Sequence, residues 1–410
     1  MGKNASGKSN LLEAILTIFA QVRTDKVDKK FHFEVVYQDI DTNEIVFRND
    51  EKGFAATRNG SSIDPNRVFP KQIVSYYAGI SERMIKLIEG YRRRKESSQE
   101  FDIVYLQQAH FRFALLAMFG SNLDRIKKGL LTDTFGIEKL ENVEIKIQKP
   151  NYVTSKEGDL SNFWLAPSNL LLFFKAIWES QSFGGTVGGN SITLGITAEG
   201  LQNLIKSSVI NNNEATLFEY LSEAFALDYI SDIDFQFKKT GISETLKFDD
   251  LSEGEKQRIG MRGTIELFLG SETLFLLDEP DAFAHPRWQW QFIPDLQETL
   301  GDSLSSQVIF VTHSPLVLST VKDNSFVMED GKIEPLYGVY GEDVSMSLAR
   351  MDTDDRLREV EDSIALYKAM IQDGNIHTED AKLLKAKLVE ELGPNHSALI
   401  ALSPLETLYE

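Results

Sequence analysis

Cysteine is absent from this sequence of 410 residues, so disulfides, thiolate metal sites and cysteine nucleophiles are excluded. The absence of cysteine also favours a cytoplasmic protein. The sequence lacks any run of 18 apolar residues, so it predicts no membrane-spanning helix. Positive charge is scarce, and the formal net charge is −19. Because such a chain repels nucleic-acid phosphate on average, any contact with nucleic acid needs a local basic patch.

The densest run of positive charge consists of Arg92, Arg93, Arg94 and Lys95. One interpretation is a contact for DNA. The plainer one, which such a charge run usually indicates, is a solvated turn between helices. Histidine is also rare, and the six histidines are scattered along the chain. The sequence therefore offers no cluster that could hold the metal of a stand-alone nuclease.

What is present is ordinary globular composition, with 42% hydrophobic and 26% charged residues, enough for a sizeable core. Changes of pattern along the chain divide it into four parts. Residues 1–80 and 246–340 contain short apolar strands, residues 81–245 read as a largely helical insertion, and residues 341–410 form a charged helical end.

Several segments have the pattern of strands or helices. Residues 31–37 and 44–48 predict a hairpin, and 72–79 predicts a further strand. The continuous apolar runs at 273–280 and 307–314 are typical of strands buried on both faces of a mainly parallel sheet. Residues 104–120 read as one helix. Near the C-terminus, apolar residues recur at helical spacing in two segments joined by residues 373–377, which predicts an α-hairpin.

The N-terminal segment fits the phosphate-loop pattern G-x-x-x-x-G-K-S without a mismatch. The candidate nucleotide-binding residues are those of the loop and the helix start: Gly2, Asn4, Ala5, Ser6, Gly7, Lys8, Ser9 and Asn10. Backbone N–H groups of such a loop cradle the β-phosphate, the lysine reaches the β/γ oxygens, and the serine hydroxyl binds Mg²⁺. The alternative is a glycine-rich turn.

An acidic pair, Asp278 and Glu279, follows the apolar run "LFLL". A carboxylate at a strand end can hold Mg²⁺, here Asp278, and a second can polarise the attacking water, here Glu279. Taken alone, the pair is equally consistent with the start of a turn. A lone histidine after a buried strand, such as His313 in "VIFVTHSP", is usually a structural core residue.

The order of motifs decides between these alternatives. The segment "LSEGEKQR" at 251–258 precedes the acidic pair by about 25 residues, and His313 follows the pair by about 34. Phosphate loop, LSxGE, LLDEP and strand-histidine together resemble the ABC-type ATPase head of the SMC/Rad50 group. The resemblance implies an α/β fold: an ABC-type P-loop ATPase head with a mainly parallel sheet, a largely helical lid and the C-terminal α-hairpin.

The same resemblance implies ATP and Mg²⁺ as cofactors and a head-to-tail dimer. Ser252, Gly254 and Glu255 would face the γ-phosphate of ATP held by a second copy, with Glu279 and His313 as catalytic residues. One departure is Glu253, where family heads often have glycine; it could weaken the ATP sandwich because glycine permits close approach to phosphate. The glutamine of the loop that leads into the lid stays open among Gln72, Gln107 and Gln108.

Two narrower resemblances concern the C-terminal part. The sequence "DEPDAFAHPRW" is similar to that of the overcoming-lysogenization-defect phage-defence ATPases. The tail resembles the ATPase subunit of Septu-type and retron-associated anti-phage systems, which implies a small HNH nuclease partner. The function expected is an ATPase that controls this nuclease. Alternatives are a scaffold that binds ATP without hydrolysis and a DNA-repair or recombination ATPase of the same type.

Only Met1 precedes the phosphate loop, although such a loop normally follows a buried strand. We expect about 15 to 30 further residues upstream, from typical strand and turn lengths. The alternative is a start that lacks the strand and gives a frayed, weak site.

Overall fold

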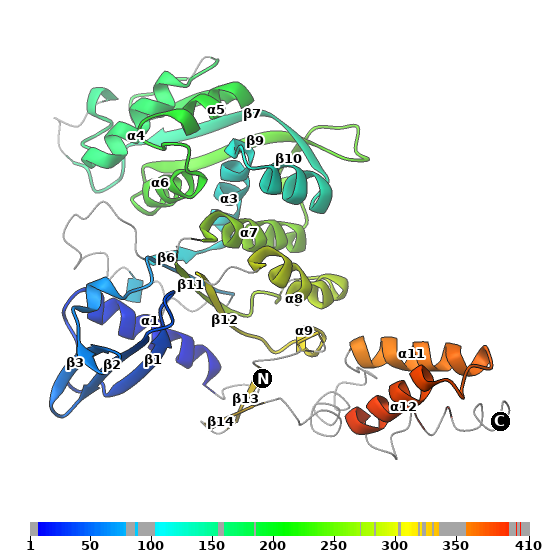
Figure 1. The fold of residues 1–410 in the computed structure, drawn as a ribbon. Coiled ribbons are helices and arrows are strands. Elements are labelled where there is room, and N and C mark those ends of the chain that lie inside the picture. The colour runs from blue at the N-terminus through cyan, green and yellow to red at the C-terminus, as the bar shows by residue number, and fades with distance from the viewer. Residues whose placement is uncertain are drawn as a thin grey trace. The chain divides into compact units, whose positions relative to one another are not determined.

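The computed structural model describes residues 7–78, 87–88, 103–154, 160–183, 186–270, 272–282, 284–301, 305–318, 320–321, 325–329, 332–335, 358–392, 399 and 402. Two compact units make up the chain (Figure 1). One consists of Met1–Asn10, His285–Glu298 and Val311–Glu410, and the other of Leu11–Ala284 and Thr299–Phe310. The expected division at 80, 245 and 340 stays a prediction.

The larger unit contains a parallel sheet with the strand order β12-β11-β5-β6, except that the last residue of β12, Val311, counts with the smaller unit. Its strands are β5 (Gln72–Tyr77), β6 (Ile103–Leu106), β11 (Thr273–Asp278) and β12 (Gln307–Val311). Strand β5 runs parallel to both β11 and β6. All six residues of β11 are buried, as its apolar sequence predicts, whereas β12 at the sheet edge is only half-buried.

Strand β6 differs from the prediction, because the sequence reads as the first turn of a helix there. Ile103–Leu106 instead pairs with β5, and the helix α3 (Gln108–Gly120) begins two residues later. The physical reason is that a short apolar run suits a buried strand and a buried helix equally well. The parallel sheet thus includes a strand from within the range 81–245.

A second sheet of the larger unit is antiparallel, with the order β10-β9-β7-β8. It consists of β7 (Ile137–Gln148), β8 (Ser191–Thr197), β9 (Ile230–Lys239) and β10 (Leu246–Lys247). The accompanying helices are α4 (Ser168–Glu179), α5 (Ala198–Lys206) and α6 (Glu214–Ala226), with a π-helical segment at Arg125–Thr134 and a short 3-10 turn at Leu160–Asn162. The expected lid helices are therefore present, together with this sheet.

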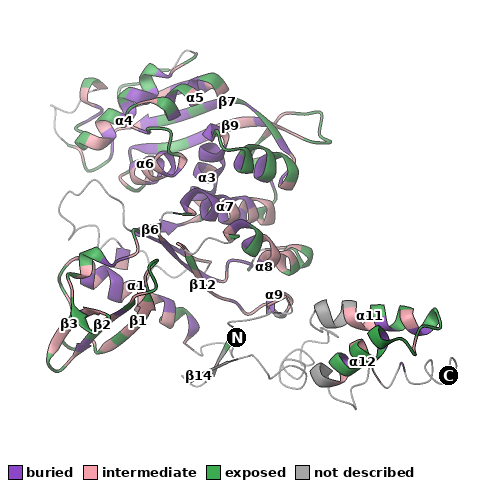
Figure 2. Cartoon of the chain, in the orientation of Figure 1, coloured by how far each residue is buried: buried purple, intermediate pink, exposed green. Residues whose placement is uncertain are grey.

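Helix α7 (Glu253–Phe268) packs along α3, and Figure 2 colours most of α3 as buried. Two glycines of α7 allow this close approach. A Cβ atom on Gly260 would lie 2.0 Å from Cδ1 of Phe111, and one on Gly263 would lie 2.6 Å from Cε of Met118. A 3-10 turn at Phe248–Asp250 leads into α7.

An antiparallel meander of four strands follows the helix α1 (Lys8–Arg23). Its strands are β1 (Phe33–Gln38), β2 (Glu44–Asp50), β3 (Gly53–Arg58) and β4 (Ser61–Ser62), followed by a 3-10 turn at Pro65–Arg67. The rings of Phe19, Phe47 and Phe69 meet at centroid distances of 5.3 to 6.1 Å and fill the space between α1 and the meander.

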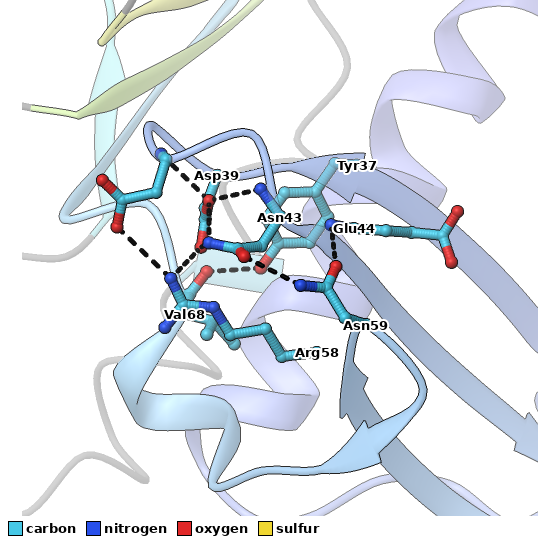
Figure 3. Close-up of polar contacts among 8 residues, drawn as sticks. Tyr37, Asp39, Asn43, Glu44, Arg58, Asn59 and Val68 are labelled. Carbon is cyan, nitrogen blue, oxygen red and sulfur yellow. Dashed lines mark hydrogen bonds and ion pairs between the residues drawn. The ribbon is translucent and has the colours of Figure 1, made fainter.

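The hairpin predicted between β1 and β2 is confirmed, and Asp39 fixes its turn (Figure 3). The Asp39 carboxylate accepts hydrogen bonds from the backbone N–H of Asp41 at 3.0 Å and of Asn43 at 2.9 Å, and it pairs with Arg58 at 2.8 Å. Slight burial acts to raise the pKa of Asp39, but the Asn43 bonds and the Arg58 charge outweigh it and lower the pKa. This acid stabilises a turn.

The smaller unit contains α8 (Pro286–Leu300, whose last two residues count with the larger unit), α9 (Pro315–Leu318), and the strand pair β13 (Phe326–Glu329) and β14 (Lys332–Pro335). It also contains the predicted C-terminal hairpin, α11 (Arg358–Gln372) and α12 (Glu379–Leu392). Within the described part of the chain, no helix has both the length and the apolar character needed to cross a membrane.

The apolar stripes of this hairpin face each other. Tyr367 and Ile371 of α11 form one buried cluster with Ala381 and Leu388 of α12, and Leu402 joins them. The apolar spacing in the sequence predicts these stripes but not their partner. Because these apolar residues pack against each other inside the hairpin, the exposed large apolar side chains among its described residues are Leu366 and Leu383.

Candidate functional site

The phosphate-loop lysine stands at the first residue of α1. Lys8 is only 6% exposed, whereas Ser9 and Asn10 are exposed. Gly7 has a φ of +96°, a left-handed conformation that favours glycine, and a Cβ there would lie 3.3 Å from Cε of Met328. The other predicted loop residues, Gly2, Asn4, Ala5 and Ser6, lie outside the described residues.

His313 lies next to the loop lysine, 305 residues away in sequence. The distance from Lys8 Nζ to His313 Nδ1 is 3.5 Å. Beyond His313, the Ser314 hydroxyl accepts a hydrogen bond from the Val317 N–H and caps the short helix α9, and it donates to Gln289 Oε1 of α8 at 2.8 Å. Two of the predicted site residues are therefore brought together within the smaller unit.

The acidic pair stands at the carboxyl end of β11, as predicted. Asp278 is 3% exposed and ends the strand, and Glu279 begins the turn with a φ of +50°. This turn is closed by hydrogen bonds from the Ala282 N–H to the Glu279 carbonyl at 3.1 Å and from the Ala78 N–H to the Asp278 carbonyl at 3.2 Å. A non-glycine residue at positive φ costs about 1–2 kcal/mol, so the surrounding bonds must hold Glu279 there.

A tyrosine of β6, Tyr105, pairs with Ser75 of β5 in the parallel sheet. Burial, together with the nearby charges of Tyr77 and Asp278, raises the pKa of Tyr105 to about 12. The phenol is therefore protonated at neutral pH.

The signature segment forms the first turn of α7. Ser252 is the N-cap, and its Oγ accepts a hydrogen bond from the Glu255 N–H at 3.3 Å. Glu255 Oε2 in turn accepts from the Ser252 N–H at 3.0 Å, which completes a capping box. Burial acts to raise the pKa of Glu255, but hydrogen bonds from Lys239 and Ser252 and the Lys239 charge outweigh it, so this pKa is lowered.

Glu253 stands where related heads often have glycine, and its side chain changes the charge at the start of α7. The Glu253 side chain is 63% exposed and pairs with Lys256, one turn along α7, at 2.9 Å. Lys256 in turn lies 6.0 Å from the centre of the Phe248 ring. Glu253 thus adds negative charge to the exposed end of α7 beside Gly254.

The register of the parallel sheet narrows the choice of glutamine. Gln72 is paired with Thr273 at the start of β5, the end opposite to Asp278, and its Nε2 donates to Glu219 Oε1 at 2.7 Å. Gln107 directly follows β6 and lies at the same edge as Asp278. Gln72 is therefore unsuited to the role, and Gln107 and Gln108 stay as candidates.

One residue that the sequence analysis missed connects two of the motifs. Gln257 of α7 is 3% exposed, and its Nε2 donates to the carbonyl of Pro280, directly after Glu279, at 2.7 Å. No pattern in the sequence distinguishes a bridging glutamine from a solvated one. Among the described residues, no group of three or more acidic or histidine side chains forms a further metal site.

The comparisons with known proteins agree with these motifs. The profile of the family described as "AAA domain, putative AbiEii toxin, Type IV TA system" matches residues 1–319. The "Retron Vc95 probable ATPase" of Vibrio cholerae serotype O1 biovar El Tor is 23% identical over 94% of this chain and 80% of its own length. The "Retron Ec83 probable ATPase" of Escherichia coli is 31% identical over 32% of this chain and 24% of its own length.

Among solved structures, the SMC head domain from Thermotoga maritima aligns with 82% of this chain and 88% of its own, at 16% identity and a TM-score of 0.35. That score lies below the level at which a shared fold follows. Motifs, sheet and relatives together define a P-loop ATPase of the ABC type. Within that class, the chain belongs to the AAA-domain family whose profile it matches, and the expected resemblance to retron-associated ATPases is confirmed.

Proposed function

We propose that this chain is the ATP-binding and ATP-hydrolysing subunit of an anti-phage defence complex that assembles with and controls a nuclease. The approach of Lys8 Nζ to His313 Nδ1, at 3.5 Å, carries the ATP-binding part of the proposal. In ABC-type heads these two side chains meet the same γ-phosphate. A buried lysine beside a histidine at the start of a 16-residue helix suits a multiply charged anion.

The roles of the other residues follow from the motifs. The loop from Gly2 to Gly7 would cradle the phosphates, and Ser9 and Asp278 would hold Mg²⁺, which neutralises phosphate charge when bound. Glu279 would accept a hydrogen bond from the attacking water and orient it. The exposed Ser9 hydroxyl and the strand-end carboxylate of Asp278 are the hard oxygen ligands that Mg²⁺ prefers.

Titration calorimetry with ATP and Mg²⁺ tests the binding part. Lys8→Ala should abolish binding in a folded protein, because the lysine meets the β/γ charge. Lys71→Ala is the matched control, since the Lys71 side chain is 70% exposed and pairs with Glu272 on the surface. Unchanged affinity in a folded Lys8→Ala variant would contradict the assignment.

A phosphate-release assay tests hydrolysis. Glu279→Gln should keep ATP bound and slow turnover by ~10²–10⁴-fold, because it removes the group that orients water. A specific observation favours the alternative of a non-hydrolysing scaffold, namely Glu253 at the exposed end of α7. Under that alternative the wild-type chain shows no turnover, and Glu253→Gly should create it.

Head-to-tail association would place Ser252, Gly254 and Glu255 against ATP held by a second copy. Light scattering of Glu279→Gln with ATP should then show a dimer or larger assembly. Adding Ser252→Arg should return it to the monomer, because the bulky cation fills the space of the second nucleotide's phosphate. An ATP-independent mass would contradict the sandwich.

The defence setting rests on the retron-associated relatives, one of which is aligned over 94% of this chain. We expect an HNH nuclease encoded beside this gene and bound through the outer face of the C-terminal hairpin. Leu366→Asp with Leu383→Asp should abolish co-purification of the nuclease. Lys368→Ala should not, because the exposed Lys368 lies about 160° around the same helix from Leu366. Loss of phage protection in the nuclease deletion separates this function from DNA repair or recombination.

DNA contact through Arg92, Arg93, Arg94 and Lys95 is the remaining part of the proposal, and these residues lie outside the described residues. Four neutralised phosphates give a slope of log affinity against log salt of about −3.6, at ~0.9 per phosphate. Replacing the three arginines by glutamate should flatten this slope in fluorescence anisotropy. Equal slopes for wild type and variant would leave the plainer interpretation, a solvated turn.

A further inference from the structure

A buried side chain of the signature helix reaches the turn that follows Glu279. Gln257 Nε2 donates to the Pro280 carbonyl at 2.7 Å, a well-formed hydrogen bond, and lies 3.5 Å from the hydroxyl of Tyr76. Gln257 and Tyr76 are 3% and 2% exposed. A buried amide is retained only where its hydrogen bonds offset the loss of water, so this bond is a fixed part of the structure.

The bond ends where the backbone is strained. Glu279 has a φ of +50°, and Pro280, whose carbonyl receives the bond, follows it directly. The Pro280 carbonyl belongs to the peptide that joins Pro280 to Asp281, one residue beyond Glu279. Anchoring this carbonyl to α7 therefore restrains the turn that carries the Glu279 carboxylate.

The other end of the connection is the signature N-cap. Ser252 lies five residues before Gln257 on α7, about 7.5 Å along the helix axis at 1.5 Å per residue. An α-helix moves as a rigid element over this distance. If a bound group displaces the signature end of α7, Gln257 and the Pro280 carbonyl bonded to it would therefore move by a similar distance.

We propose that Gln257 is a positioning residue that couples the signature end of α7 to Glu279. It does not touch the reacting atoms, and it acts by holding the Glu279–Pro280 turn in the orientation that hydrolysis needs. This inference rests on the proposed role of Glu279 in orienting water. It adds a route by which nucleotide held by a second copy, when it contacts Ser252, would affect the position of Glu279.

Gln257→Leu removes the hydrogen bond at nearly unchanged volume. We expect ATP affinity to change less than about twofold and kcat to fall by about 10²-fold, the size of effect that a displacement of about 1 Å produces. The matched control is Gln202→Leu. Gln202 Nε2 also donates to backbone carbonyls, those of Phe119 at 3.3 Å and Gly120 at 3.0 Å, and its loss should leave kcat unchanged.

A double-mutant cycle separates positioning from general destabilisation. In the Glu279→Gln background, Gln257→Leu should have almost no further effect on kcat, because the group that it positions is already lost. An equal loss of rate in both backgrounds would overturn the proposal, and so would a wild-type kcat for Gln257→Leu. If Gln257→Leu fails to fold, Gln257→Asn provides the same cycle, since its shorter amide cannot reach Pro280.

Hydrogen exchange gives a readout that does not depend on turnover. Gln257→Leu should speed exchange of the backbone amides of Asp281 and Ala282, and Gln202→Leu should not. If the wild-type chain proves inactive but this difference appears, the hydrolysis proposal fails while the coupling of helix and turn stands. If exchange in the turn is the same in both variants, the coupling itself is refuted.

Discussion

The packing of α7 on α3 predicts very different effects for two chemically identical substitutions, Gly260→Ala and Gly263→Ala. Both glycines lie inside α7, so each alanine gains up to ~1 kcal/mol of helix propensity. The difference lies in what the new methyl group meets. At Gly260 it meets the base of the Phe111 side chain, and at Gly263 it meets the end of the Met118 side chain.

The distances set the magnitude. A Cβ at position 260 would lie 2.0, 2.1 and 2.6 Å from Cδ1, Cγ and Cβ of Phe111, where ordinary contacts begin at 3.4 Å. Phe111 is 1% exposed, so its ring cannot turn away without moving the helix, and overpacking of this kind costs ~3 kcal/mol or more. Subtracting the propensity gain leaves Gly260→Ala about 2 kcal/mol or more less stable.

At position 263 the nearest atoms are Cε and Sδ of Met118, at 2.6 and 3.0 Å. The flexible thioether can move by rotation at a cost of ~1 kcal/mol, which the propensity gain offsets. Gly263→Ala should therefore stay within about 1 kcal/mol of wild type.

Urea unfolding followed by circular dichroism measures both variants, with the slope m checked for constancy. Phe111→Ala combined with Gly260→Ala should recover part of the loss, because the clash is removed. Equal midpoints for Gly260→Ala and Gly263→Ala would refute the packing described here.

Three further outcomes are expected. Gly7→Ala should weaken ATP binding in calorimetry, because alanine at a φ of +96° is strained by ~1–2 kcal/mol, and wild-type affinity would contradict this. Ser252→Ala should lower the free energy of unfolding by ~1 kcal/mol through loss of the N-cap, and Ser252→Asp should restore it. Because the pKa of Glu255 is lowered in the folded state, its stabilising contribution is present above pH ~4.3 and is lost as the pH falls through the folded pKa; acid titration of Glu255→Gln should lack this step.

The strands of the parallel sheet show what the sequence can predict. The residues of β11 are buried at all six positions, so the continuous apolar run in the sequence correctly predicted a strand covered on both faces. The β1–β2 turn was also predictable, because Asp39 and Asn43 form hydrogen bonds with each other within the turn. Both features depend on residues that are close together in the chain, so a short stretch of sequence is enough to predict them.

The residues that the sequence analysis missed depend on distant partners. Strand β6 reads as a helix because its four apolar residues join the apolar start of α3, and only pairing with β5 decides between the two. Gln257 looks like any polar residue of an amphipathic helix until Pro280 is placed 2.7 Å away. The meeting of Lys8 and His313 was predicted only through the resemblance, since 305 residues separate them.

The N-terminal end of α7 combines two roles that compete for the same groups. Ser252 and Glu255 satisfy each other in the capping box, and Glu253 and Glu255 place negative charge where the helix dipole is positive. A phosphate approaching this end would need the Ser252 hydroxyl and N–H that Glu255 now occupies, and it would be repelled by both glutamates. The head-to-tail association proposed above would therefore require the capping box to open, and Lys239 and Lys256 already pair with the two carboxylates that would have to move. The end of α7 that would meet the nucleotide is thus closed by its own side chains, and the same helix carries Gln257 to the turn at Glu279.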